Sequence, residues 1–554
     1  MKQLLNSFEF LVLSLIGHRR IMKKVLLFII FVLYLWTLEA SGRERLANED
    51  LSGLYARSIE QVLRLEPEEV DLATAALIIS EQWSDMVYGR RYLSQLDDMA
   101  YEILERLEDG KLLESYKAIA VINKYLFEEL GFESISEASN PNDLFLHTVL
   151  DKRRGYCLSL SILYLSLGER LGLPLYGVVV PGHFFVRYDD GQVRFNIETT
   201  GKGGYASDEH YIEKFNVPEG DDDSIYMLNL DKIQTLGCFF NNLGNSYSDI
   251  SDTDSAQRAL EMAVDINPLL AESHTNLGNI YLKKGWIKEA VKEYRAALEI
   301  KPDDAKTHNN LGNAYFQQEW WNDAISEYTK SVNLDPNFID AYKNLSSAYC
   351  KKEMYESASS WVRQALSLKP EDAGLYKQLG DVYSQMGGYK EAIIQYEKAL
   401  KFDGDLAEAY YGLGVCCNKL GLFEEEIVAY KEALAIKPDM VSALVNLGGA
   451  YFAKQDYDTA IEFYRRAVGI KPEDSTIRYN LGAAYSNKED YQQAVIEYRK
   501  AIEIEPRMGD AHKGLGLAYY KLEKYDLAAE HIKIAKDLGV EIAEELLAAI
   551  EDKL

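Results

Sequence analysis

The sequence predicts an α+β domain followed by an all-α superhelical solenoid, and two observations carry this prediction. Between residues 157 and 198, an apolar helical run is followed by three short runs with the composition of β-strands. From residue 237 onward, a Leu-Gly pair returns every 34 residues, the length of one helix-turn-helix unit. The expected order is therefore a mixed domain first and a helical array second.

The composition argues against nucleic acid as a partner and against a metal site or cofactor. The chain has 554 residues, of which 47% are hydrophobic and 27% charged, as in ordinary globular proteins with more than one domain. Its formal net charge of -28 excludes nucleic acid as the expected partner, since an acidic surface repels phosphates. The 5 cysteines show no zinc-type spacing, so we predict no disulfide framework, no metal site and no cofactor.

The N-terminus resembles an export signal. Met22, Lys23 and Lys24 precede a short apolar run over residues 25–38. This run is short for a membrane span, so residues 1–42 are predicted to be either a signal peptide or an uncleaved signal-anchor. In both cases the body of the protein is expected to be exported, either periplasmic or anchored to the membrane and facing the periplasm or the outside.

The first domain is predicted over residues 45–215, with a helical N-terminal part, and is centred on Cys157. Gly155 allows a tight turn before this cysteine, and the apolar run after it predicts a buried helix. At the start of a helix, backbone N–H groups and the helix dipole favour a thiolate, and Arg153 and Arg154 add positive charge. We therefore expect a thiolate at this position.

Strands are predicted over residues 176–180, 181–188 and 193–198. If Asp190 and Gly191 form a two-residue hairpin loop, His183 lies directly across from Glu198. A three-residue loop would instead place Ile197 opposite His183 and turn Glu198 to the other face. We favour the first register because Asp-Gly is the stronger hairpin signal.

A cysteine, a histidine and a carboxylate form the set that a thiol enzyme needs. Cys157 would be the nucleophile and His183 the base, and Glu198 would fix the tautomer of the imidazole. Asn196 shares a face with Glu198 and is the alternative third residue. The competing interpretation is that His183 and Glu198 are paired only to satisfy each other at the surface of a sheet.

The motifs in this region resemble those of a known superfamily. Gly155-Tyr156-Cys157, Pro181-Gly182-His183-Phe184 and the run from Asn196 to Thr200 are similar to the transglutaminase-like (papain-type cysteine enzyme) superfamily. The Arg-Arg-Gly approach resembles its bacterial SirB-like branch, and the resemblance covers about residues 66–215. It implies Cys157 as nucleophile, His183 as base, and Glu198 where the superfamily usually has aspartate. Many members of this branch lack the cysteine, so the resemblance implies either an active enzyme or a non-catalytic domain.

The second part of the chain is predicted to be nine tetratricopeptide (TPR) repeats over residues 237–542. Leu-Gly pairs run in register from Leu243-Gly244 to Leu515-Gly516, and Leu345-Ser346 replaces the pair once. Residues 216–236 are predicted to be a linker, and residues 543–554 a capping helix. Such repeats stack into a superhelix with a concave groove, which implies a protein or peptide partner.

Asparagine recurs just before the repeated leucine and would form a column along the first helices. An amide both donates and accepts, so such a column can hold the backbone of an extended peptide. It resembles the asparagine ladder of the O-linked N-acetylglucosamine transferase repeats. The alternative is a consensus polar residue on a solvated face. The six residues are Asn242, Asn276, Asn310, Asn344, Asn446 and Asn480.

Two functions remain in competition at the level of sequence. One is an exported thiol-dependent peptidase, amidase or acyl transferase whose repeats recruit a protein or peptide. The other is a non-catalytic scaffold whose repeats assemble a protein complex.

Overall fold

The computed structural model describes residues 56–84, 87–110, 116–136, 140–217 and 225–553. The chain divides into two compact units, with the boundary between Pro302 and Asp303, and each unit is described by itself. The predicted export signal over residues 1–42 lies outside the described residues. None of the described helices is both long enough and apolar enough to span a membrane.

The front domain, defined here as the described part of residues 56–217, begins with helices. Helix α4 is buried from Leu72 to Ser80, and its first turn is capped by Asp71, whose Oδ1 accepts a hydrogen bond from the Thr74 N–H at 2.6 Å. The described N-terminal part of this domain is helical. Its helices are α3 (Ile59–Val62), α4 (Leu72–Trp83), α5 (Gly89–Gly110), α6 (Ala118–Asn123) with a π-helical continuation Lys124–Glu129, and α7 (Leu146–Lys152).

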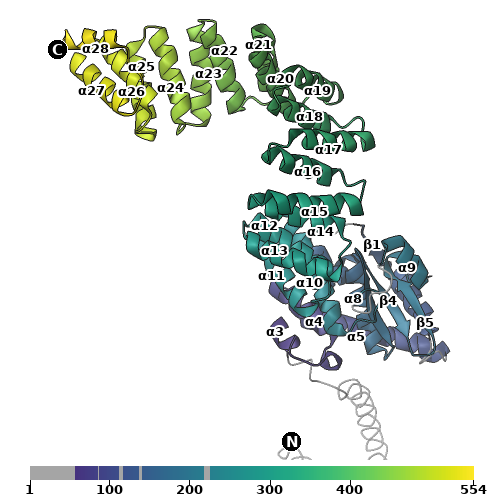
Figure 1. Ribbon diagram of the computed structural model, residues 1–554. Helices are drawn as coiled ribbons and strands as arrows, with labels where there is room; N and C mark the ends of the chain where they lie inside the picture. Colours follow the sequence, from purple (N-terminus) through teal and green to yellow (C-terminus); the bar gives the residue numbers. More distant parts are fainter. Residues whose placement is uncertain (1–55, 85–86, 111–115, 137–139, 218–224, 554) are drawn as a thin grey trace, which may run out of the picture. The chain divides into compact units, whose positions relative to one another are not determined.

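An antiparallel sheet forms the second half of the front domain, with its four strands in sequence order. Helix α8 (Cys157–Arg170) and the other front helices share a core with Phe184, Val186 and Ile197. Helix α9 (Asp208–Phe215) packs on the other face, where Phe185 and Tyr211 belong to a second cluster. Strand β4 thus lies between α8 and α9 (Figure 1). The strands are β3 (Leu175–Val180), β4 (His183–Asp189), β5 (Arg194–Glu198) and β6 (Gly204–Ala206), and a two-stranded parallel pair joins β1 (Glu133–Ser134) to β2 (Arg154–Gly155).

The predicted hairpin register is wrong by two residues. Asp189 pairs with Arg194, so the loop between β4 and β5 has four residues instead of two. The Asp190 carboxylate explains the longer loop, because its Oδ1 accepts hydrogen bonds from the N–H groups of Gln192 at 2.8 Å and Val193 at 2.6 Å. His183 is therefore not directly across from Glu198. A shift of two residues preserves the face of each side chain, so both still lie on the α9 side of the sheet.

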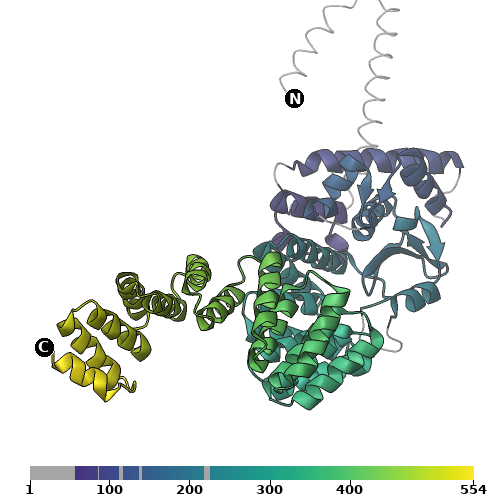
Figure 2. The ribbon, with the colours of Figure 1, turned by 90° about the horizontal axis from the view of Figure 1, so that it is seen from above.

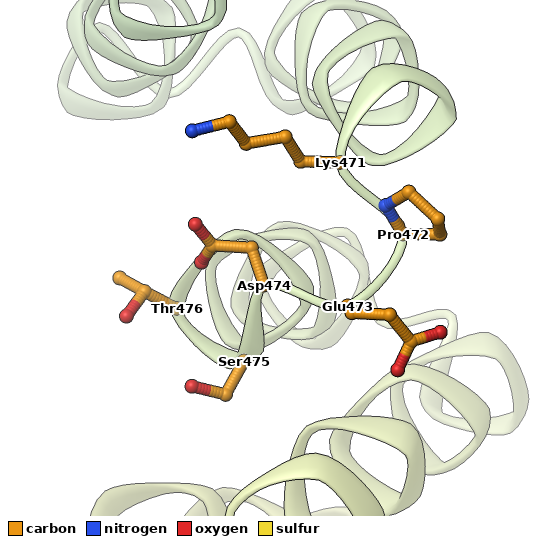
Figure 3. Close-up of a pocket in the computed structure, with 6 residues that line it drawn as sticks. All are labelled: Lys471, Pro472, Glu473, Asp474, Ser475 and Thr476. Atoms are coloured by element: carbon orange, nitrogen blue, oxygen red, sulfur yellow. The ribbon is translucent and has the colours of Figure 1, made fainter. Parts of the chain in front are cut away.

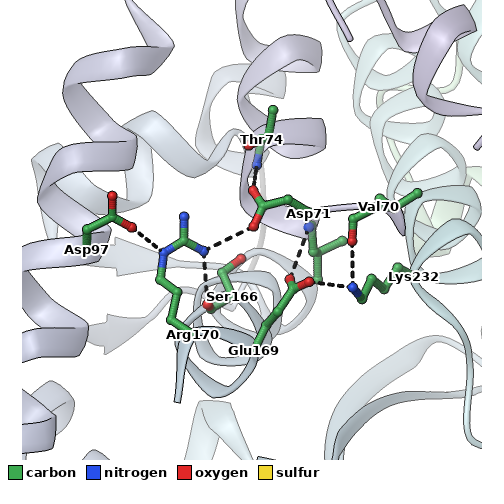
Figure 4. Close-up of polar contacts among 9 residues, drawn as sticks. Val70, Asp71, Thr74, Asp97, Ser166, Glu169, Arg170 and Lys232 are labelled. Carbon is green, nitrogen blue, oxygen red and sulfur yellow. Dashed lines mark hydrogen bonds and ion pairs between the residues drawn. The ribbon is translucent and has the colours of Figure 1, made fainter. Parts of the chain in front are cut away.

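The first repeat helix, α10 (Lys232–Asp249), begins inside the stretch predicted to be a linker. Asp231 and Gln234 form a capping box that starts the helix early. The side chain of Lys232 then binds the Glu169 carboxylate of α8 and the Val70 carbonyl oxygen, the latter at 2.6 Å (Figure 4). Part of the predicted linker is therefore helix anchored to the front domain.

The first repeat unit, α10 with α11 (Thr253–Ile266), shares its core with the front domain. Trp83 of α4 contacts Phe240 and Tyr247 of α10, with ring centroids 6.3 and 5.7 Å apart. Phe239 of the same helix lies 6.2 Å from Phe145. Because these aromatic side chains are buried against front-domain helices, this unit is part of the first compact body and not a free element of the solenoid.

Nine helix pairs in the described part of the chain follow the predicted period, and within each compact unit consecutive pairs pack in chain order (Figures 1 and 2). The repeated glycine is required by close packing, since a Cβ on Gly278 would lie 2.6 Å from the Tyr294 ring. After the first unit, the pairs are α12 (Ala271–Lys283) and α13 (Ile287–Ile300), α14 (Ala305–Gln317) and α15 (Trp321–Leu334), α16 (Ile339–Lys351) and α17 (Tyr355–Leu368), α18 (Ala373–Gln385) and α19 (Tyr389–Phe402), α20 (Ala407–Leu420) and α21 (Phe423–Ile436), α22 (Val441–Ala453) and α23 (Tyr457–Ile470), α24 (Ser475–Asn487) and α25 (Tyr491–Ile504), and α26 (Gly509–Lys521) and α27 (Tyr525–Asp537). Helix α28 (Glu544–Glu551) covers the last pair with Ile550 and lies within the predicted cap.

Candidate functional site

The imidazole of His183 and the carboxylate of Glu198 form a direct contact, as the sequence predicts. The His183 Nε2 and Glu198 Oε2 atoms are 2.7 Å apart, and both side chains are largely buried. The Thr200 N–H donates to Glu198 Oε1 at 3.0 Å. Burial opposes ionisation of Glu198, but the hydrogen bonds from His183 and Thr200 outweigh it and lower the pKa of the carboxyl to about 2. The ionised carboxylate therefore holds a proton on Nε2 and leaves Nδ1 as the nitrogen that can act as a base.

Two aromatic residues of α9 hold this pair in place. The Phe215 ring stacks on the His183 imidazole with centroids 4.9 Å apart and planes inclined by 2°. The Tyr211 hydroxyl donates to Glu198 Oε2 at 3.0 Å, and its ring also stacks on His183. Sequence reasoning missed both residues, because their spacing of four on α9 reads as ordinary helix packing.

The expected thiolate at Cys157 is not what the structure shows. The residue is only 5% exposed. Burial is the largest influence and raises the pKa of the thiol to about 12, although the backbone N–H groups of Phe184 and Leu158 act in the opposite direction. Arg153 and Arg154 are exposed and do not offset the burial. The helix start therefore favours the anion as predicted, but the packing around the sulfur favours the neutral thiol.

The thiol lies at the start of α8, which packs on β4, the strand that carries the imidazole. The Phe184 N–H, next in the chain to His183, acts to lower the pKa of the Cys157 thiol, whereas the His183 side chain is turned toward α9. In the described part of the chain, no hydrogen bond joins Sγ to the imidazole. The structure therefore brings His183 to Glu198 directly and brings Cys157 to the same strand.

Asn196, the alternative third residue, serves a different partner. Its Oδ1 accepts from Arg187 Nε at 2.8 Å, and its Nδ2 donates to Asp208 at 2.6 Å. It is 2% exposed and makes no contact with His183 among the described residues. The geometry therefore favours Glu198 over Asn196 as the residue that orients the imidazole.

The asparagine column is partly buried and connects neighbouring first helices. In the first compact unit, Asn276 Nδ2 donates to Asn241 at 3.1 Å. In the second unit, Asn344 Nδ2 donates to Asn309 at 2.9 Å and to Asn313 at 3.1 Å. Asn446 donates to the Tyr430 hydroxyl at 3.2 Å. The remaining members, Asn242, Asn310 and Asn480, are also half-buried, so the column does not lie on a fully solvated face.

The rest of the described surface offers little that resembles a reactive site. A shallow hollow lies at the turn before α24 and is lined by residues 471–476 (Figure 3). Its Asp474 carboxylate already caps that helix by accepting from the Ile477 N–H at 3.1 Å. Among the described residues, no group of three or more His, Cys, Asp or Glu side chains could hold a metal ion.

Comparison with known proteins agrees with this division of the chain. A family model described as the transglutaminase-like superfamily matches residues 90–223. Models of the TPR repeat match between residues 278 and 508, so the first helix pair lies outside the matched region. A protein of Xylella fastidiosa, "UPF0162 protein", is 32% identical over 126 residues, which are 22% of this chain and 43% of that protein. The chain thus spans less than half the length of this curated relative.

Two solved structures are similar in sequence to part of this chain. The crystal structure of MamA is 30% identical and covers 29% of this chain and 95% of its own, with a TM-score of 0.28. The crystal structure of YrrB, a TPR protein with an unusual peptide-binding site, is 25% identical and covers 36% of this chain and 99% of its own, also with a TM-score of 0.28. The chain therefore contains a transglutaminase-like domain, matched over residues 90–223, followed by tetratricopeptide repeats, matched between residues 278 and 508.

Proposed function

We propose that the front domain performs thiol-dependent acyl chemistry, as a peptidase, amidase or acyl transferase, on a protein or peptide that the repeats recruit. The observation that carries this proposal is the 2.7 Å contact between His183 of β4 and Glu198 of β5, beside the helix α8 that begins at Cys157 and packs on β4. Glu198 keeps His183 in one tautomer, so Nδ1 can take the thiol proton when a substrate approaches. The raised pKa of the thiol implies that this transfer occurs in the substrate complex and not in the resting protein.

The proposal also includes export and a peptide groove. The apolar run over residues 25–38 supports export to the periplasm or the outer face of the membrane, with or without a retained anchor. For the groove, the Nδ2 groups of Asn276 and Asn344 are used between helices, whereas the Oδ1 atoms of both have no hydrogen-bond partner among the described residues. These carbonyl oxygens can accept from the backbone N–H groups of an extended peptide.

A non-catalytic scaffold is the second candidate function, and the burial of Cys157 favours it. A thiol that is 5% exposed, with a pKa raised to about 12, behaves as a small core residue unless the domain opens. In that case, His183 and Glu198 stabilise the sheet and the repeats alone carry the function.

Labelling of the thiols separates the two candidates. Treatment of the full chain with iodoacetamide at neutral pH, followed by mass spectrometry, should modify Cys157 faster than the half-buried Cys350 if a base activates it. Replacement of His183 by alanine should then slow the labelling of Cys157 by about tenfold or more, because general bases contribute at least this much. Burial alone predicts the reverse order, with Cys350 first.

Cys238 serves as the internal control, since it is fully buried inside the first repeat unit and has no histidine partner among the described residues. Equal rates at Cys157 and Cys238, unchanged by His183→Ala, would support the scaffold and reject the acyl chemistry.

Replacement of column asparagines tests the groove. Asn344→Ala and Asn446→Ala together should weaken binding of peptides selected from a random library by about tenfold, as expected for the loss of one or two hydrogen bonds. Helix content measured by circular dichroism should stay the same. Asn333→Ala, at an exposed position of α15, is the matched control and should leave binding unchanged. An equal loss in both variants would show that the column has no part in binding.

A further inference from the structure

Several repeat units contain a polar pair that links the first helix to the second. The two positions are 19 residues apart, and a side-chain nitrogen faces a carboxylate in each of the following examples. His274 Nδ1 lies 2.7 Å from Glu293, and Arg478 Nη1 lies 2.8 Å from Glu497. The last unit differs, because His512 Nδ1 lies 3.0 Å from the Nδ1 atom of a second histidine, His531.

Both ring nitrogens of His274 face hydrogen-bond acceptors. Its Nε2 faces the Pro268 carbonyl oxygen at 3.1 Å, and its Nδ1 faces the Glu293 carboxylate. Burial raises the pKa of Glu293, but the hydrogen bond from His274 more than offsets this effect, so the pKa is lowered and the carboxyl is ionised. Both partners of His274 are acceptors, so a proton on either ring nitrogen has a partner to donate to.

His512 faces one acceptor and a second histidine. Its Nε2 faces the Pro506 carbonyl oxygen at 3.2 Å and must donate there. A neutral His512 therefore accepts at Nδ1, and His531 donates from its own Nδ1. One extra proton can be placed on His531 Nε2. A second must go onto His512 Nδ1, where it would set one N–H against another at 3.0 Å and place two positive charges together.

The charged groups around His512 and His531 do not compensate for two positive charges on this pair. Burial, His512, and Arg499 of α25 lower the pKa of His531, whereas Glu530 of α27 raises it, and the net pKa is lowered from its usual 6.5. The Tyr519 ring of α26 stacks on His531 with centroids 5.8 Å apart, and α28 adds apolar side chains to this core. Lys513 is turned away and donates to the Glu541 carbonyl oxygen. Within the described residues, no carboxylate bonds to either imidazole.

We propose that the His512–His531 pair opens the last repeat unit, α26 with α27, and releases α28 under mildly acidic conditions while the other units stay folded. The stability of the last unit should fall at low pH because the pKa of His531 is lowered in the folded protein. A histidine that is harder to protonate in the folded state contributes stability above its usual pKa, and this contribution is lost as the pH falls below about 6.5. The His274–Glu293 pair lacks this conflict, because both ring nitrogens of His274 face hydrogen-bond acceptors. The chain therefore contains an acid-sensitive pair and an acid-tolerant pair built on the same two positions.

Hydrogen exchange of the full chain, measured by mass spectrometry at pH 7.5 and 5.0 and corrected for intrinsic rates, tests the proposal. Protection of α26 and α27 should fall by about tenfold for each unit by which the pKa of the pair is displaced, whereas protection of α12 and α13 should be retained. His531→Glu copies the His274–Glu293 pair into the last unit and should abolish the acid-induced loss. His531→Gln, which cannot titrate, should abolish it as well.

Each outcome supports or overturns the proposal. Unchanged protection of α26 and α27 at pH 5.0 would overturn it, as would an equal loss of protection in all units, which would indicate general acid denaturation. A loss that persists in both His531→Glu and His531→Gln would place the sensitivity elsewhere and would also overturn it.

Discussion

Replacing Arg187 by methionine is expected to destabilise the front domain by about 3 kcal/mol or more, because it removes a fully buried cation from its partners. Arg187 is 0% exposed and lies in β4. Its guanidinium donates to Asn196 Oδ1 and Asp208 Oδ1 at 2.8 Å each, and to the Met227 carbonyl oxygen at 2.7 Å. Without it, Asn196 Oδ1 and the Met227 carbonyl oxygen lose this donor, and Asp208 loses its buried cation. The loss should appear as faster hydrogen exchange in β4 and β5 and a lower urea midpoint.

Arg194→Met is the matched control for this variant. Arg194 binds the same Asp208 carboxylate, at 3.3 Å, but its side chain is 50% exposed. An exposed ion pair contributes about 1 kcal/mol or less, so this change should leave the urea midpoint nearly unchanged. Similar destabilisation by both replacements would show that the charge of Asp208 matters more than the burial of Arg187.

Glu426→Ala is expected to stabilise the sixth repeat unit, α20 with α21, by about 1–3 kcal/mol. The eight other described units have alanine at this position, each 0% exposed, whereas Glu426 is buried at 2% exposure: Ala256, Ala290, Ala324, Ala358, Ala392, Ala460, Ala494 and Ala528. Glu426 Oε1 accepts from Asn418 at 3.0 Å, but Oε2 has no partner within the described residues. Removing a half-satisfied carboxylate should therefore slow the hydrogen exchange of α21.

The stabilisation by Glu426→Ala should depend on pH. Burial raises the pKa of Glu426 above its usual 4.5, so the cost of keeping it ionised in the folded state grows as the pH rises. The difference between variant and parent should be largest near pH 8 and should shrink as the pH falls toward 4.5. Glu425→Ala, at an exposed neighbouring position, should show no such effect. A pH-independent difference would mean that side-chain volume, and not charge, destabilises α21.

The repeated part of the chain was predictable because its signal is local and periodic. Leucine, glycine and alanine recur in register, and each describes a contact inside one unit, such as Gly278 against Tyr294. A periodic pattern does not predict the contacts that a unit makes outside the array. The first unit reads as an ordinary repeat, but its Lys232 and Phe240 contact Val70 and Trp83 of the front domain, more than a hundred positions away. No local pattern carries that information.

The front site was predictable in part, and the reasons differ for each residue. The contact between His183 and Glu198 was foreseen even though the register was wrong, because a slip of two residues keeps both side chains on one face. The burial of Cys157 was not foreseen, since it depends on β4 packing over the start of α8. Tyr211 and Phe215 were missed because their roles depend on how α9 lies on the sheet.

The anchoring of the first repeat unit also has a consequence for synthesis of the chain. The core of the front domain includes Phe239, Phe240 and Leu270, so it cannot be completed until those residues have left the ribosome. The later repeats close mainly local contacts and can form one pair at a time as they emerge. A nascent chain stopped shortly after residue 217 should therefore remain protease-sensitive, and one extended past residue 300 should become resistant before the remaining repeats are made.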